Sequence, residues 1–515
     1  MNGAESLVRT LLAGNIDVCF TNPGTSEMHF VAALDQVPGM RSVLCLFEGG
    51  ATGAADGYYR MAGRPASTLL HLGPGLGNGL ANLHNAKKAG SGVVNIVGEH
   101  ATYHIALDAP LTADIEGIAR PVSHWVKTSM ASGDIAQHGA EAIAAAMVPP
   151  GQIATLILPG DTAWNDGSGV AEIPDFADRT PIADGKIDAA AEALKAGERT
   201  LMLLGGAALK DENLRLAGQI AAATGCGLLT EWANARLDRG AGRIEVNRIP
   251  FVVEKALDVL KDYDTIVLMG ARAPVAFFAY PNKPSILTQE GCSFVDVADV
   301  GDDIPGALDA LVDAVGARKT EPKGVIAAKR PDIPDGDIDP PGIAAVIGAL
   351  LPENAVVVDE SVTTGREFFP TTAGAPPHTW LNNRGGSIGY GLPVATGAAI
   401  ACPGQKVIAL EGDGSAMYTV QSLWTIAREN LDVTIMVFSN RSYKILRGEL
   451  TNVGVQNPGP RAVDMLTLNR PDLDWVQMAR GMGVDGTKVS DCKALAKAFE
   501  YGLAQNGPYL IELEM

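Results

Sequence analysis

Two oxygen-bearing side chains, Asp413 and Asn440, each follow a run of apolar residues that is typical of a buried strand. The runs are 407–410 and 433–438, and a segment with helical periodicity separates them. A strand-helix-strand unit makes the two strands parallel, so both side chains are expected at the same edge of the sheet. A carboxylate oxygen and an amide oxygen at one edge suit Mg²⁺ that also binds a phosphate group.

The residues beside Asp413 could hold that phosphate. Gly412 and Gly414 allow close backbone approach, while Ser415 and Ala416 open the expected helix, whose free N–H groups and dipole favour an anion. Taken alone, Gly-Asp-Gly is more often a tight turn with a helix cap. The asparagine at the end of the next strand is what favours a Mg-diphosphate site.

A second polar edge is expected near the N-terminus, where Thr25, Glu48 and His71 each follow a strand candidate. Ligands of open parallel sheets bind outside the carboxyl ends of the strands. The alternatives are a helix-capping role for Glu48 and a structural role for His71. The segment 73–79, "GPGLGNG", lacks the spacing Gly-x-Gly-x-x-Gly, so it is either another phosphate loop or a turn before a helix.

Other common catalytic motifs are missing from the sequence. It has no Gly-x-x-x-x-Gly-Lys loop, no His-Glu-x-x-His pair and no Gly-x-Ser-x-Gly elbow. His100 and His104 could bind a metal together only within a helix, and we expect them to line a loop instead. The usual nucleotide-hydrolysing, zinc-protease and serine-hydrolase functions are therefore excluded.

The elements that must position these residues alternate along the chain as short apolar runs and amphipathic stretches, which predicts α/β structure with mainly parallel sheets. We predict three consecutive α/β domains, 1–173, 187–318 and 343–515. A linker is expected at 174–186, and a stretch rich in Pro and Asp at 319–342 is expected to be an exposed connection. A chain of 515 residues agrees with about three domains of roughly 150 residues.

The charge and the cysteine content of the chain limit the kinds of binding partner and the cellular compartment that we expect. The net charge of −19 repels nucleic acid and anionic membranes, and no basic run offsets it. The six cysteines lie far apart in mostly apolar contexts, which predicts buried reduced thiols and a cytoplasmic protein. The sequence shows no signal peptide and no apolar run near 18 residues, so neither export nor membrane spanning is expected.

Glu48 after a strand, followed much later by Gly-Asp-Gly and Asn440, resembles the thiamine diphosphate enzymes of the decarboxylase and acetolactate synthase superfamily, over nearly the whole chain. The resemblance implies thiamine diphosphate and Mg²⁺ as cofactors and a 2-oxo acid as substrate. It also implies a homodimer, or a homotetramer of dimers, in which the domain of Glu48 faces the neighbouring subunit's diphosphate-binding domain. The implied fold has an N-terminal pyrimidine-binding, a central and a C-terminal diphosphate-binding domain.

The resemblance also implies a role for each site residue. Asp413, Asn440 and the carbonyl of Ser442 would bind Mg²⁺, and Glu48 would activate the cofactor through its pyrimidine ring. The implied cofactor-binding set is Ile388, Gly412, Asp413, Gly414, Ser415, Ala416, Asn440, Ser442 and Tyr443, where Ile388 folds the cofactor. Tyr443 and Leu446 are predicted either to line the substrate pocket or to pack in the core.

Within the superfamily the sequence resembles the benzoylformate decarboxylases most, with His71 and Thr25 as catalytic residues. Thr25 stands where those enzymes have serine, and its extra methyl group would narrow the pocket. Their second catalytic histidine should fall within "APVAFFAYPN", where this sequence has Ala279 and Tyr280. Its absence weakens the expectation of a simple decarboxylase, because protonation of the enamine loses a relay.

We therefore expect decarboxylation of a 2-oxo acid, with the enamine protonated or used for carboligation. The first alternative is an acetolactate synthase-type carboligase that condenses pyruvate with a second carbonyl, although its flavin-contacting pattern and its usual tail are not found. A second alternative is a cofactor-binding regulatory subunit of low activity, against which the presence of Glu48 argues. A flavin or nicotinamide enzyme is the third.

Overall fold

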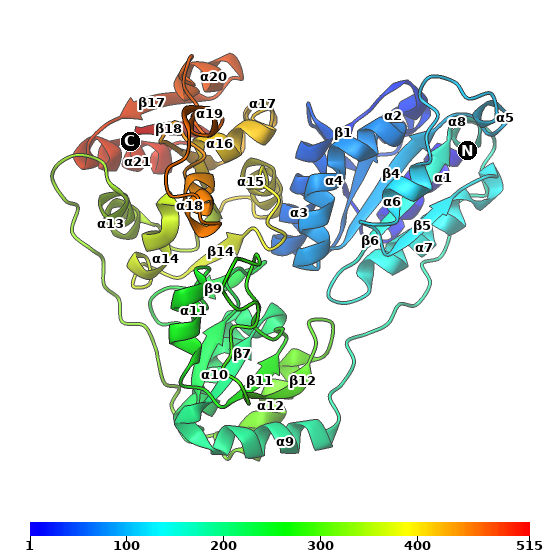
Figure 1. Ribbon diagram of the computed structural model, residues 1–515. Coiled ribbons are helices and arrows are strands. Elements are labelled where there is room, and N and C mark those ends of the chain that lie inside the picture. Colours follow the sequence, from blue (N-terminus) through cyan, green and yellow to red (C-terminus); the bar gives the residue numbers. More distant parts are fainter.

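Three β-sheets organise the chain, and the computed structural model describes all of residues 1–515. Each sheet belongs to one lobe: an N-terminal lobe in blue and cyan, a central lobe in green, and a C-terminal lobe in yellow to red (Figure 1). All strand pairs but one are parallel. The predicted α/β class with mainly parallel sheets is confirmed.

The N-terminal sheet has the strand order β2-β1-β3-β4-β6-β5, and all its pairs are parallel. Its strands are β1 (Val18–Asn22), β2 (Arg41–Leu44), β3 (Ala66–Leu70), β4 (Val93–Glu99), β5 (Trp125–Thr128) and β6 (Ile153–Pro159). Its helices include α1 (Gly3–Ala13), α2 (Met28–Gln36), α3 (Glu48–Ala62), α4 (Leu72–Ala89), α5 (Thr102–Ile105), α7 (Ile135–Met147) and α8 (Gly160–Trp164). Because β1, β2 and β3 are neighbours, their carboxyl ends form one edge.

The central sheet has the order β10-β8-β7-β11-β12 and is also parallel. Its elements are α9 (Asp184–Lys195), β7 (Thr200–Leu204), α10 (Asp211–Thr224), β8 (Gly227–Thr230), β10 (Asn247–Arg248), α11 (Val253–Leu260), β11 (Thr265–Met269), β12 (Ser293–Ala298) and α12 (Ile304–Ala314). Helix α9 begins inside the linker expected at 174–186.

The C-terminal sheet has the order β17-β18-β16-β15-β13-β14-β9. Its own strands are β13 (Val356–Glu360), β14 (His378–Asn382), β15 (Val407–Gly412), β16 (Val433–Ser439), β17 (Asp485–Val489) and β18 (Tyr509–Glu514). Its helices include α13 (Pro340–Leu350), α15 (Gly391–Ala401), α16 (Asp413–Ala416), α17 (Ser422–Arg428), α18 (Lys444–Asn452), α20 (Trp475–Gly481) and α21 (Cys492–Ala504). Asp339 caps α13 by accepting from the N–H of Gly342, and two prolines open the helix.

One strand crosses the expected domain division. Strand β9 (Leu237–Arg239) lies within the range 187–318 but pairs antiparallel with β14, so it completes the C-terminal sheet. The expectation that this range forms only a central sheet is therefore wrong at β9. No helix of the chain is both long and apolar enough to cross a membrane.

Helices α3 and α15 join the N-terminal and C-terminal lobes, and they lie side by side at the centre of Figure 1. Their backbones are in near contact, because a Cβ atom on Gly57 would collide with the carbonyl of Val394 and one on Gly397 with the carbonyl of Ala54. Only glycine fits at such an approach. This seam fixes the start of α3, where Glu48 lies, relative to the C-terminal lobe.

Candidate functional site

The structure brings Asp413 and Asn440 together at the carboxyl edge of the C-terminal sheet. Strands β15 and β16 pair parallel, with Gly412 opposite Phe438, so both residues follow the same end of the sheet. One carboxylate oxygen of Asp413 accepts from the N–H of Gly414 at 2.8 Å and the other from that of Arg441 at 2.6 Å. Since Arg441 directly follows Asn440, the two loops are tied together by one hydrogen bond.

This edge has the chemistry of a hard-cation site. Asp413 is buried, and burial raises its pKa to about 6 even though two N–H groups bond to it. The amide oxygen of Asn440 accepts from the N–H of Ser442 at 3.0 Å, which orients it as an oxygen donor. The chain has no group of three or more His, Cys, Asp or Glu side chains that could hold a metal. A single carboxylate with neutral oxygens fits Mg²⁺ that keeps water or phosphate ligands.

The helix that follows Asp413 is broken into short pieces. A single long helix was expected, but α16 is followed by a 3-10 turn, Met417–Thr419, and then by α17. Thr419 and Val420 are β-branched in succession, and the Thr419 hydroxyl donates to the carbonyl of Gly389 at 3.1 Å. The break therefore connects the Gly-Asp-Gly motif to the turn that contains Ile388.

The side chains next to the motif are packed closely around it. A Cβ atom on Gly414 would lie 2.6 Å from the ring of Tyr443, so this glycine makes room for the tyrosine. The Ser415 hydroxyl donates to the carbonyl of Gly412 at 3.1 Å and is directed inward. Leu446, for which core packing was an alternative, is 44% exposed.

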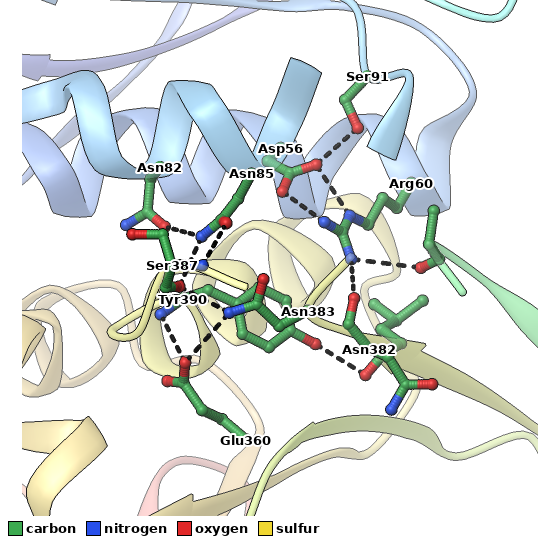
Figure 2. A network of polar contacts seen from close by, with 12 residues as sticks. Asp56, Arg60, Asn82, Asn85, Ser91, Glu360, Asn382, Asn383, Ser387 and Tyr390 are labelled. Carbon is green, nitrogen blue, oxygen red and sulfur yellow. Dashed lines mark hydrogen bonds and ion pairs between the residues drawn. The ribbon is translucent and has the colours of Figure 1, made fainter. Parts of the chain in front are cut away.

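Ile388 lies on a turn, 385–391, that leads into α15, and its side chain is 36% exposed. Glu360, the last residue of β13, accepts from the N–H groups of Gly389 and Gly391 at 3.0 Å and of Tyr390 at 3.2 Å. Figure 2 shows the bond to Tyr390. Burial nevertheless raises the pKa of Glu360 to about 7. The turn is thus held from the sheet side by one buried carboxyl group.

In the N-terminal lobe, Glu48 is the first residue of α3 and is 8% exposed. One of its carboxyl oxygens accepts from the amide of Asn78 at 3.0 Å. A Cβ atom on Gly75 would lie 3.0 Å from Glu48 Oε1 and 3.3 Å from the Cβ of His71, so both side chains pack on this glycine. The glycine-rich segment 73–79 lies inside α4 and permits helix packing, so the expectation of either a phosphate loop or a turn before a helix is wrong.

His71 is held by a carboxyl group that the sequence did not single out. Its Nδ1 lies 2.8 Å from Oε2 of Glu27, which also accepts from the N–H of Gly24 at 2.8 Å. Burial raises the pKa of Glu27. The next residue, Leu72, has φ +48, a strained backbone for a large side chain, and it aims His71 toward Glu27.

Thr25 lies close to Glu27 in the chain, but it lines a cavity of its own. It lines a cavity of about 300 Å³ together with His29, Glu99, His100, His104 and seven further residues, and neither Glu48 nor His71 lines this cavity. The rings of His100 and His104 are 5.3 Å apart, in and beside α5. Thr25 therefore lines a different cavity, although its neighbour Gly24 lies directly against the His71 ring.

The segment in which a second catalytic histidine was sought is aromatic. Phe277 contacts Phe278, Trp232 and Phe251, with ring centroids 4.6 to 5.3 Å apart. Its ring tip lies 2.7 Å from where a Cβ on Gly386 would be, so the cluster abuts the turn of Ile388. No imidazole comes from this segment.

Glu27, Asn78 and Glu360 were missed because single residues carry little signal. Glu27 stands three residues after Gly24, the spacing of a capping box, which could have indicated it. Asn78 starts a series with Asn82 and Asn85 that marks one face of α4. Nothing in the strand sequence before Glu360 indicates that three N–H groups from a distant turn would converge on it.

The chain is similar to known proteins over its whole length. Residues 1–119 match the N-terminal TPP binding domain of thiamine pyrophosphate enzymes, and residues 366–513 match the C-terminal TPP binding domain. The chain is 51% identical to the Mycobacterium tuberculosis protein named "Putative acetolactate synthase large subunit IlvX", over 100% of this chain and 99% of that one. It is 29% identical to benzoylformate decarboxylase of Pseudomonas aeruginosa, over 96% and 95% of the two chains.

A solved structure shares the whole fold. The thiamine diphosphate-dependent 4-hydroxybenzoylformate decarboxylase of Rhodococcus jostii superposes with a TM-score of 0.87 and 24% identity. The match covers 100% of this chain and 99% of that one.

Proposed function

Because the chain belongs to the thiamine pyrophosphate enzyme family that includes acetolactate synthase and benzoylformate decarboxylase, we propose that it decarboxylates a 2-oxo acid with thiamine diphosphate and Mg²⁺. The supporting observation is the hydrogen bond of Asp413 to the N–H of Arg441. It joins the two strand ends from which Mg²⁺ would be bound by Asp413, Asn440 and the carbonyl of Ser442.

Residues of the C-terminal lobe would bind the diphosphate part of the cofactor, and residues of the N-terminal lobe would act on its pyrimidine ring and on the substrate. In the C-terminal lobe, Gly412, Gly414, Ser415 and Ala416 would hold the diphosphate, and Tyr443 would close over them. When bound, thiamine diphosphate supplies the electron sink that accepts the pair left by departing carbon dioxide. Ile388 would support the folded shape of the cofactor from the turn 385–391.

In the N-terminal lobe, Glu48 would hold a proton at the pyrimidine nitrogen of the cofactor, and Asn78 orients its carboxyl group. His71 would bind the substrate carboxylate or move a proton, with Glu27 fixing its ring at Nδ1. Thr25 would lie at the rim. Because the family's pyrimidine-binding domain works with a diphosphate-binding domain, we propose a homodimer, or a homotetramer of dimers, as the active form.

Carboligation is the second candidate, and a specific observation favours it. The segment with Ala279 and Tyr280 presents the aromatic cluster around Phe277 instead of an imidazole. Burial raises the pKa of Tyr280 to about 12, so its phenol is a poor proton donor at neutral pH. Slow protonation would leave time for a second carbonyl to be captured, as in an acetolactate synthase-type reaction.

The deciding experiment is turnover of purified protein with thiamine diphosphate and Mg²⁺ on pyruvate, benzoylformate and branched 2-oxo acids. Chromatographic product analysis separates aldehyde from ligation products, which are acyloins or 2-hydroxy-3-oxo acids. Aldehyde alone supports the decarboxylase, and ligation products support the carboligase. Bound cofactor without any product would refute both and support a regulatory subunit.

A further inference from the structure

The turn that carries Ile388 is also held from the N-terminal lobe, by Asn85 of α4. The amide of Asn85 faces Ser387 with both of its ends, because its Oδ1 accepts from the Ser387 N–H at 3.1 Å and its Nδ2 donates to the Ser387 carbonyl at 2.9 Å (Figure 2). The residue before Ile388 therefore has both backbone polar groups bonded by one side chain. This two-point contact fixes the orientation of the peptide as well as its position.

Asn82, one turn earlier on α4, holds the residue after Ile388. Its Nδ2 donates to the carbonyl of Gly389 at 3.2 Å and to the carbonyl of Gly49 at 2.8 Å. Gly49 directly follows Glu48. One amide nitrogen therefore bridges the residue next to Glu48 and the residue next to Ile388.

The two asparagines also fix one another. Asn85 Nδ2 donates to Asn82 Oδ1 at 3.0 Å, which leaves the nitrogen of Asn82 facing the two carbonyls. Both residues are at most 3% exposed, so a different orientation would leave buried amide groups without partners, at a considerable cost. The geometry is specified by hydrogen bonding and not by packing alone.

We propose that Asn82 and Asn85 are positioning residues that keep the turn of Ile388 in a fixed register with the start of α3, where Glu48 lies. The inference rests on the proposed function, in which Ile388 acts on the cofactor held by its own C-terminal lobe and Glu48 acts on the cofactor held by the neighbouring subunit. Neither asparagine needs to contact the cofactor. The two asparagines of the N-terminal lobe hold the turn of Ile388 in the C-terminal lobe by hydrogen bonds. Glu360 bonds to the same turn from the C-terminal sheet.

A purely structural role would make the same contacts, so the test needs a matched control. Asn95 on β4 is a buried asparagine whose amide bonds to Thr68 at 2.8 Å and to Thr155 at 3.1 Å, away from the turn. Asn95→Ala removes two side-chain hydrogen bonds from the same lobe. It should lower the melting temperature without changing the turn.

The experiment compares Asn82→Ala, Asn85→Ala and Asn95→Ala. Amide hydrogen exchange of the peptide 383–391 is measured in cofactor-free protein. The Kd of thiamine diphosphate is measured by adding the cofactor to the protein in the presence of Mg²⁺ and following tryptophan fluorescence. Loss of one net hydrogen bond should speed exchange of the turn about tenfold in the first two variants only. The cofactor Kd should rise about tenfold and kcat should fall at saturating cofactor, with the KM of the 2-oxo acid nearly unchanged.

Asn85→Asp keeps the volume and the acceptor for the Ser387 N–H but loses the donated bonds to the Ser387 carbonyl and to Asn82 Oδ1, so it serves if Asn85→Ala does not fold, and it should also speed exchange of the turn relative to the wild type. Unchanged exchange in the turn would overturn the inference. Faster exchange with unchanged Kd and kcat would overturn it as well. A wild-type protein without affinity for thiamine diphosphate would refute the proposed function, a failure that is visible before any variant is made.

Discussion

Replacing Glu411 by glutamine tests a buried carboxyl pair beneath the candidate site. Glu411 and Glu360 are paired residues of β15 and β13, and both are buried. Neither oxygen of Glu411 has a hydrogen-bond donor. Burial and the charge of Glu360 raise the pKa of Glu411 well above its ordinary value, so the folded chain favours the protonated, uncharged form of Glu411.

The retained proton sets a pH dependence whose size can be worked out. In the unfolded chain Glu411 ionises near its ordinary pKa of 4.5, whereas in the folded chain it stays protonated. The folded state then holds up to one more proton, so stability is full below about pH 4.5 and falls above it by at most about 1.4 kcal/mol per pH unit, the limit for a single proton. Between pH 6 and 8 this loss is at most about 2.7 kcal/mol. Glu411→Gln keeps the volume and a donor but removes the titration.

Calorimetric melting temperatures at pH 6, 7 and 8 are the assay. The melting temperature of Glu411→Gln minus that of the wild type should increase over this range, by no more than roughly 5 to 10 °C. Glu500→Gln, at an exposed position on α21 of the same lobe, is the control. Its melting temperature should change with pH in the same way as that of the wild type. A difference for Glu411→Gln that stays constant with pH would refute the protonated pair, whatever its absolute size.

Three further outcomes are expected. Glu48→Gln should lower kcat about 10²-fold at saturating cofactor, because glutamine cannot exchange a proton; equal kcat values would remove Glu48 from this role. Since burial raises the pKa of Asp413 to about 6, Mg²⁺-dependent cofactor binding should weaken about tenfold per unit below pH 6 and stay level above it, as titrations at several pH values would show. Asp413→Ala should bind weakly at every pH. Gly397→Ala should destabilise the lobe contact by about 1–3 kcal/mol, whereas Gly77→Ala, into open space on α4, should not lower the melting temperature; equal melting temperatures would contradict the close seam.

The parts of the site that could be predicted rest on local patterns. Strands β15 and β16 are continuous apolar runs, and the rule that a crossover makes strands parallel then places Asp413 and Asn440 at one edge. The same argument places Glu48 and His71 at one edge of the N-terminal sheet, after the two strands that flank β1. These inferences need only the spacing of apolar residues along the sequence and the geometry of a single parallel sheet.

The parts that could not be predicted depend on contacts between distant segments. Strand β9 is three residues long, and nothing in "LDR" indicates that it pairs with β14 rather than with its own lobe. Glu360 ends a strand of ordinary appearance, and its partners are N–H groups on a turn that follows another strand. The break after α16 arises because Thr419 bonds to Gly389, a contact that helical periodicity does not contain.

The carboxyl edge of the C-terminal sheet concentrates buried acids, and this connects stability to the proposed function. Glu360, Glu411 and Asp413 end or follow neighbouring strands, and burial raises the pKa of each. For Asp413 the rise from 3.8 to about 6 means that ionisation costs the folded lobe about 3 kcal/mol. A divalent cation beside Asp413 would offset that cost, because an opposite charge favours the carboxylate. The loaded lobe is therefore expected to be more stable than the apo lobe by the amount that mass action gives, RT ln(1 + [Mg²⁺]/Kd), and relief of the penalty at Asp413 is one of the contributions to that Kd.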